Sequence, residues 1–118
     1  MKLMQPLPTG LLEPDMPDLM EKSGQAAELL RLLGNQKRLL LACHLAMCGE
    51  MAAGALAEAV GLSMPALSQH LALLRDGGIV ASRRDAQSII YRLSDPRAAE
   101  VLALLHHLYC GPNAAPLC

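Results

Sequence analysis

The turn around Gly61 constrains this 118-residue sequence more than any other feature. Ala57 stands four residues before Gly61, and Leu67 stands six residues after it. Two helices that cross at a tight turn need a small residue for close approach, a glycine for left-handed backbone, and an apolar residue that packs back onto the first helix. The spacing therefore predicts a helix-turn-helix with helices at Ala55–Val60 and Met64–Arg75, the second capped by Ser63.

The pattern changes from helical to alternating directly after the pair Gly77–Gly78. The segments Ile79–Arg83 and Ser88–Leu93 are rich in β-branched and aromatic residues. Four residues, 84–87, separate them, which favours a β-hairpin. We therefore predict two strands that form a ribbon beside the helix-turn-helix.

The rest of the chain is helical in pattern, rich in Leu and Ala and without Phe or Trp. The predicted helices run from near Asp18 to Leu33, from the cap Asn35 to about Cys48, and from Asp95–Pro96 through the Leu-rich segment to Cys110. The fold class is mainly α with a small β-hairpin wing: a winged helix-turn-helix. Residues 1–17 are predicted as a flexible N-terminal tail, residues 18–110 as one domain for DNA binding and dimerisation, and residues 111–118 as a C-terminal tail.

Charge and hydropathy exclude several classes of protein. The net charge of −1 and the pI of about 6.4 exclude a basic coat over the whole surface. Residues 62–97 nevertheless carry five Arg against three Asp, so a local basic face is expected there. No apolar run approaches the roughly 20 residues of a membrane-spanning helix, and prolines interrupt any secretory signal. We expect a cytoplasmic protein that needs no cofactor and is not an enzyme.

The second helix of the pair and the hairpin carry polar side chains suited to DNA. Short polar side chains early on such a helix can hydrogen-bond to base edges in a major groove, and arginines at a wing can bind phosphates. The candidate DNA-binding residues are Ser63, Ser68, Gln69, His70, Arg75, Arg83, Arg84 and Gln87. The alternatives are an ordinary helical hairpin with a solvated ribbon, or a winged helix that contacts only other proteins.

The last helix is apolar on more than one face, through Val101, Leu102, Leu104, Leu105 and Leu108. A monomer of this size cannot cover such a surface, so the pattern predicts a homodimer in which the first helix shares the interface.

The four cysteines are expected to be thiols in a cytosolic chain, for metal binding, redox sensing or core filling. A soft metal ion prefers several thiolates at short spacing. Ala55–Val60 contains no cysteine, and the adjacent His106 and His107 point about 100° apart on a helix. We therefore predict no metal site. Cys43 also suits a role as an apolar filler of the core.

The segment LAEAVGLSMPALSQHLALLRDGGIVASRRDAQSIIYRLSDPR resembles the ArsR-type winged-helix repressors, and LLRLLGNQKRLLLACHL matches the segment that precedes it in that family. The resemblance covers roughly residues 24–110. It implies a homodimer that binds a palindromic DNA operator and represses transcription until an inducer releases it.

The contexts of two cysteines, LLLACHL around Cys43 and LHHLYC before Cys110, resemble the persulfide-sensing SqrR/BigR-type branch of that family. This resemblance implies that reactive sulfur species bridge Cys43 and Cys110 by a disulfide or polysulfide, which releases the operator of sulfide-oxidation or detoxification genes. The alternatives are a general thiol-redox repressor, a metal-responsive repressor, and, in another class, a small thiol enzyme or persulfide carrier. Cys48 and Cys118 have no counterpart in this two-cysteine pattern.

Overall fold

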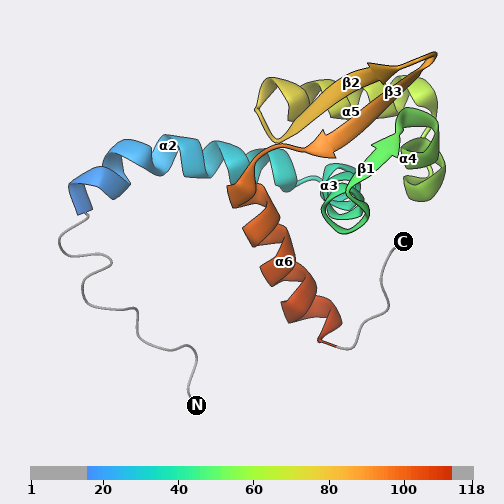
Figure 1. Cartoon of the computed structure of the whole chain (residues 1–118). Coiled ribbons are helices and arrows are strands. Elements are labelled where there is room, and N and C mark those ends of the chain that lie inside the picture. The colour runs from blue at the N-terminus through green and yellow to red at the C-terminus, as the bar shows by residue number, and fades with distance from the viewer. Residues whose placement is uncertain (1–15, 113–118) are drawn as a thin grey trace.

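The computed structural model describes residues 16–112 as a body of packed helices with a small sheet, from which one long helix extends (Figure 1). The helices are α2 (Met16–Leu33), α3 (Gln36–Cys48), α4 (Ala53–Val60), α5 (Met64–Asp76) and α6 (Pro96–Cys110). The strands are β1 (Glu50–Ala52), β2 (Val80–Asp85) and β3 (Ser88–Leu93). The predicted class, mainly helical with a hairpin wing, is confirmed.

The sheet has three antiparallel strands in the order β1-β3-β2. The predicted hairpin was incomplete in two ways. It lacked β1, which pairs with β3 through Met51 and Tyr91. It also placed four residues in the loop, whereas the ladder continues to the pair Asp85 and Ser88, so that only residues 86 and 87 connect the strands. Ala86 has a positive φ of 56°, as the tight turns between paired strands require.

Local capping fixes where most helices begin and end. The Asn35 side chain accepts hydrogen bonds from the backbone N–H groups of Lys37 and Arg38, and Gly49 ends α3 with a φ of 87°. The Asp95 side chain accepts from the N–H of Arg97 at the start of α6. These predicted caps are confirmed. The cap at Asp18 is wrong, because α2 begins earlier, at Met16, and Asp18 lies in its first turn.

The core lies where α3, α4, α5 and α6 meet the sheet. Its large, fully buried side chains include Leu41, Leu45, Leu56, Leu67, Leu71, Leu74, Ile79 and Leu102. Removing so many leucine side chains from water supplies the main driving force for this arrangement.

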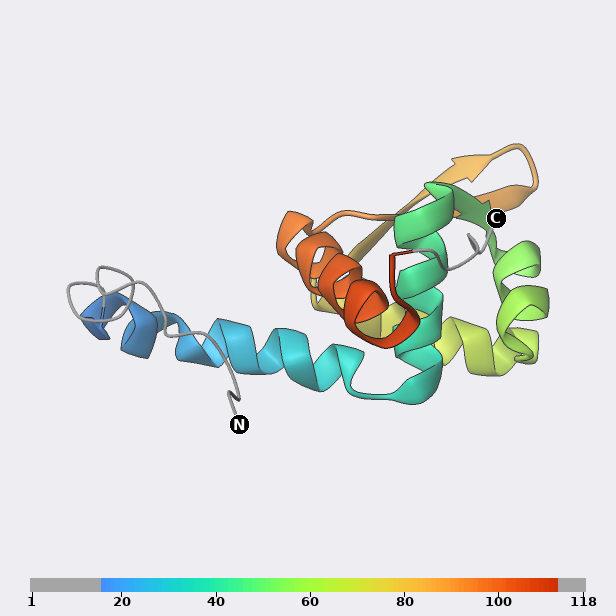
Figure 2. The ribbon, with the colours of Figure 1, turned by 90° about the horizontal axis from the view of Figure 1, so that it is seen from below.

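The helix α2 extends away from this core in both views (Figures 1 and 2). Its last turn is anchored by Leu32 and Leu33, which are buried, whereas Leu19 and Leu30 are exposed. Of the predicted flexible tails, residues 1–15 and 113–118 lie outside the described residues. None of the helices within residues 16–112 combines the length and hydrophobicity of a bilayer-spanning segment.

Candidate functional site

The turn between α4 and α5 has the geometry that its sequence predicts. Gly61 is left-handed, with φ 71° and ψ 42°. The N–H of Leu62 donates to the carbonyl of Ala57 at 2.9 Å, and Ala57 and Leu67 are both buried where the helices cross. The Ser63 hydroxyl accepts a hydrogen bond from the N–H of Ala66 at 3.3 Å. Ser63 therefore caps α5, and the helix-turn-helix is confirmed.

The exposed face of α5 presents two of the three predicted polar side chains. Ser68 and Gln69 are exposed on the first half of the helix. His70 is not fully exposed as predicted: it is half-buried, and its buried Nδ1 has no hydrogen-bond partner among the described residues. The reason is the helical period, since His70 shares a face of α5 with the buried Leu67 and Leu74.

The adjacent residues Arg83 and Arg84 of β2 lie on opposite faces of the sheet, because side chains alternate along a strand. Arg84 shares a face with Ser82, whose hydroxyl accepts a hydrogen bond from Arg75 of α5 at 3.4 Å. This face is therefore turned toward α5. Arg83 lies on the other face, and Gln87 is exposed in the loop.

Arg83 is not a free cation. Its Nη2 donates to Oε1 of Glu50 at 2.9 Å and its Nε donates to Oε2 at 3.3 Å, so the two side chains pair through both carboxylate oxygens. This hydrogen-bonded pairing lowers the pKa of the Glu50 carboxyl below its usual range. Within the described residues Arg75, Arg84 and Arg92 form no ion pair.

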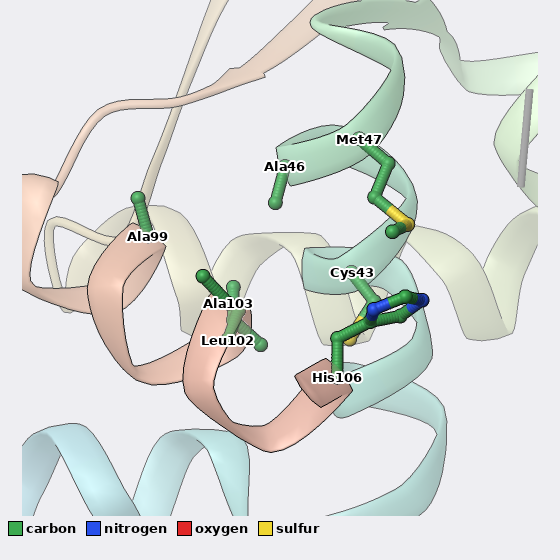
Figure 3. Close-up of a pocket in the computed structure, with 7 residues that line it drawn as sticks. All are labelled: Cys43, Ala46, Met47, Ala99, Leu102, Ala103 and His106. Carbon is green, nitrogen blue, oxygen red and sulfur yellow. The ribbon is translucent and has the colours of Figure 1, made fainter. Parts of the chain in front are cut away.

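The second candidate site is an apolar groove between α3 and α6, with a volume of about 240 Å³ (Figure 3). It is lined by Cys43, Ala46 and Met47 from α3 and by Ala99, Leu102, Ala103 and His106 from α6. Small residues at successive turns of both helices leave this space open. Cys43 and His106 are the titratable groups in the lining, and His106 points across the groove toward α3.

Cys43 and Cys110 are free cysteines, and the charge of Cys110 acts on the Cys43 thiol. Cys43 is half-buried and Cys110 is exposed at the last turn of α6. Burial raises the pKa of the Cys43 thiol, and the charge of Cys110 raises it further. The two cysteines that the SqrR/BigR-type resemblance pairs thus lie within electrostatic range of each other. Cys48 differs from the expectation of free thiols, because it is disulfide-bonded.

Within residues 16–112 no cluster of three or more His, Cys, Asp or Glu side chains is placed to hold a metal ion.

Sequence reasoning missed two parts of these sites. Glu50 was overlooked because a strand of three residues, Glu50–Ala52, has no recognisable alternation. The groove was overlooked because Met47, Ala99 and Ala103 read as ordinary helical residues. The i, i+4 spacing of Ala99 and Ala103 on one face of α6 is the signal that could have pointed to an open groove.

Comparison with known proteins agrees with this arrangement. Residues 35–82 match the model of the bacterial regulatory proteins of the arsR family. The chain is 39% identical to the biofilm growth-associated repressor of Agrobacterium fabrum, over 94% of this chain and 92% of that protein. It also resembles the solved structure of reduced HlyU from Vibrio cholerae, with a TM-score of 0.75 and 40% identity over 79% of this chain and 97% of that one. HlyU is described as a transcriptional activator.

A third match bears on assembly. A homodimeric winged helix-turn-helix DNA-binding domain from Mycobacterium bovis superimposes with a TM-score of 0.66 and 28% identity, covering 89% of each chain. The identity to the Agrobacterium repressor extends over nearly the full length of both proteins. The chain therefore belongs to the bacterial arsR family, and it is a DNA-binding transcriptional regulator with a winged-helix fold rather than an enzyme.

Proposed function

We propose that this regulator is a homodimeric repressor that binds a palindromic operator when reduced and is released when Cys43 and Cys110 become bridged by sulfur. One observation carries this proposal. Two free thiols, Cys43 on α3 and Cys110 on α6, lie close enough for the charge of Cys110 to raise the pKa of Cys43. Genes for sulfide oxidation or detoxification are the proposed targets.

In this proposal α5 reads the operator in the major groove. Ser68 and Gln69 contact bases, while Ser63, Arg75, Arg84 and Gln87 contact the phosphate backbone or the minor groove. His70 and Arg83 remain candidates for DNA contact, although His70 is half-buried and Arg83 lies on the opposite face of the wing, where it pairs with Glu50. The neighbouring Arg75 and Arg84 supply positive charge that no acidic side chain of the described residues neutralises in an ion pair.

The switch is a sequence of two sulfur transfers, with a low-molecular-weight persulfide as the oxidant. The exposed Cys110 thiolate attacks the outer sulfur of the persulfide, which becomes a Cys110 persulfide as the small thiol leaves. The thiol of Cys43 then gives up its proton and attacks Sγ of Cys110. The bond between Sγ and the added sulfur breaks, hydrogen sulfide leaves, and Cys43 and Cys110 are joined by a disulfide. A longer bridge forms when a second low-molecular-weight persulfide first transfers its outer sulfur to Cys43 and leaves as a small thiol. The outer sulfur of the Cys43 persulfide then attacks Sγ of Cys110, hydrogen sulfide leaves, and three sulfur atoms join the two residues.

The variants Cys43→Ser and Cys110→Ser test this function. Each reduced variant is expected to bind the operator as the unsubstituted protein does, because neither residue lies on the α5 or wing surface. Each is expected to stay bound after treatment with glutathione persulfide, because one end of the bridge is missing. Operator binding is followed by fluorescence anisotropy, with reversal by dithiothreitol as the control. Normal release of either variant by persulfide would contradict the proposal.

A general thiol-redox repressor is the second candidate, and the same two thiols favour it. It predicts that hydrogen peroxide and oxidised glutathione release the operator as rapidly as glutathione persulfide does.

A further inference from the structure

The groove between α3 and α6 contains an imidazole as well as a thiol. The other residues that line it are Ala46, Met47, Ala99, Leu102 and Ala103, none of which can accept a proton from a thiol (Figure 3). His106 is half-buried there and points toward α3. Cys110 follows His106 by four residues, so both side chains lie on the same face of α6.

The bridging step requires a proton to move inside this groove. Cys43 attacks as a thiolate, but burial and the charge of Cys110 both raise its pKa, so it holds its proton at neutral pH. The hydrosulfide that leaves Cys110 must in turn gain a proton to depart as hydrogen sulfide. No other side chain in the lining can take the proton at one end of this transfer and deliver it at the other.

We propose that His106 carries this proton: a ring nitrogen accepts the proton of the Cys43 thiol as the sulfur attacks, and then donates it to the departing hydrosulfide. Imidazole is the side chain best suited to exchange a proton near neutral pH. The inference rests on the proposed function, because it concerns the step that joins Cys43 to Cys110.

Other titratable groups near the groove are placed less well. His44 adjoins Cys43 on α3, but its side chain points about 100° away around the helix and does not line the groove. His107 is exposed on α6 and does not line it either. No Asp, Glu, Lys or Arg side chain contributes to the lining from α3 or α6. Cys43 shares the groove with the imidazole, and Cys110 lies one helical turn after His106 on α6.

The adjacent histidines provide a matched pair of variants, His106→Gln and His107→Gln. The rate of Cys43–Cys110 bridging by glutathione persulfide is measured by rapid quenching and mass spectrometry between pH 5.5 and 9. We expect His106→Gln to slow bridging about tenfold at neutral pH, less than the roughly 100-fold or larger effects typical of acid–base groups, because water can still accept the proton of Cys43. The fall in rate at low pH is expected to become shallower in His106→Gln, because protonation of the imidazole no longer contributes to it, and His107→Gln is expected to match the unsubstituted protein.

Two further measurements separate proton transfer from a structural effect. The reduced His106→Gln protein is expected to keep its melting temperature and operator affinity. In His106→Ala, added imidazole is expected to restore the bridging rate, which a purely structural role does not predict. An unchanged rate and pH profile in His106→Gln, or equal slowing in His107→Gln, would overturn the role of His106. Failure of the unsubstituted protein to form any bridge would instead overturn the proposed function.

Discussion

Cys43 is a thiol that its surroundings keep protonated. Burial on α3 disfavours the thiolate, and the charge of Cys110 adds to this effect, so the pKa of Cys43 lies above that of an ordinary thiol. The folded protein therefore holds this proton more tightly than the unfolded chain does. The resulting contribution to stability is complete below the ordinary thiol pKa and is lost as the pH rises through the raised pKa of Cys43.

The variant Cys110→Ser tests this coupling between the two thiols. Removing the charge of Cys110 is expected to lower the pKa of Cys43, although burial keeps it above the ordinary value. The measurement is the rate of Cys43 alkylation by iodoacetamide as a function of pH, resolved by peptide mass. The pH at which Cys43 alkylation reaches half its maximal rate is expected to be lower than in the unsubstituted protein. A midpoint that stays in place or rises would show that the two thiols do not interact.

At the scale of elements, the wing separates two arginines that are adjacent in sequence. Arg84 lies on the face turned toward α5, whereas Arg83 lies on the opposite face and pairs with Glu50 of β1. The ion pair joins the two edge strands across β3. Arg84 is thus free to bind a phosphate of DNA. Arg83 has to break its ion pair with Glu50 before it can bind a phosphate.

The substitutions Arg84→Met and Arg83→Met form a matched pair, since each removes one charge and keeps the apolar stem. Arg84→Met is expected to weaken operator binding and to reduce the slope of log affinity against log salt by about 1 per protomer. Arg83→Met is expected to change the slope less, because Glu50 already neutralises Arg83. Titrations at several salt concentrations measure both, and a larger loss of slope in Arg83→Met would contradict this assignment.

The turn of the helix-turn-helix depends on the left-handed backbone of Gly61. Gly61→Ala is expected to lower the free energy of unfolding by about 1–2 kcal/mol, because a Cβ strains this conformation. Gly54→Ala is the control: Gly54 lies within α4, a Cβ there meets nothing within 4 Å, and alanine favours a helix by about 0.5–1 kcal/mol. Urea unfolding measures the free energy of unfolding of both variants. Equal effects of the two substitutions would contradict the role given to Gly61.

The elements that the sequence predicts well are those with local signals. Asn35, Ser63 and Asp95 cap their helices as predicted, and Gly61 forms the expected turn. Other features depend on residues distant in the chain. The short β1 exists because its backbone pairs with β3, some 40 residues later, and no local pattern shows that pairing. The pairing of Arg83 with Glu50 likewise arises only from tertiary packing.

At the scale of the whole molecule, α2 and α6 leave large apolar side chains exposed. Leu104 is 56% exposed, Leu108 63% and Tyr109 84% on α6, and Met20 is 70% and Leu30 60% exposed on α2. These surfaces agree with the predicted dimer through the first and last helices. A second copy of the chain would remove them from water.

The double substitution Leu104→Glu/Leu108→Glu tests this dimer. Two buried carboxylates per protomer are expected to dissociate it and thereby to abolish tight operator binding, since each protomer then binds a single half-site. Analytical ultracentrifugation measures the mass in solution. Ile89→Glu, an exposed position on the wing, is the control that keeps the dimer. A double variant that remains dimeric would place the interface elsewhere.

A physical path joins the thiol groove to the turn that positions α5. Cys43 lies on α3, and Lys37 at the start of the same helix donates from Nζ to the carbonyl of Val60 at 2.7 Å, directly before Gly61. A bridge from Cys43 to Cys110 would tie α3 to α6. Coupling of about 1–3 kcal/mol is typical between two such sites, which corresponds to a roughly 5- to 150-fold change in affinity.

The most direct test follows bridging and operator binding in the same anaerobic samples. The reduced protein is treated with glutathione persulfide, hydrogen peroxide or oxidised glutathione, then mapped by peptide mass while operator binding is measured. A Cys43–Cys110 cross-link is expected to form fastest with persulfide, to include species with added sulfur, and to appear in step with loss of operator binding. Loss of binding without this cross-link, or the cross-link without loss of binding, would contradict it.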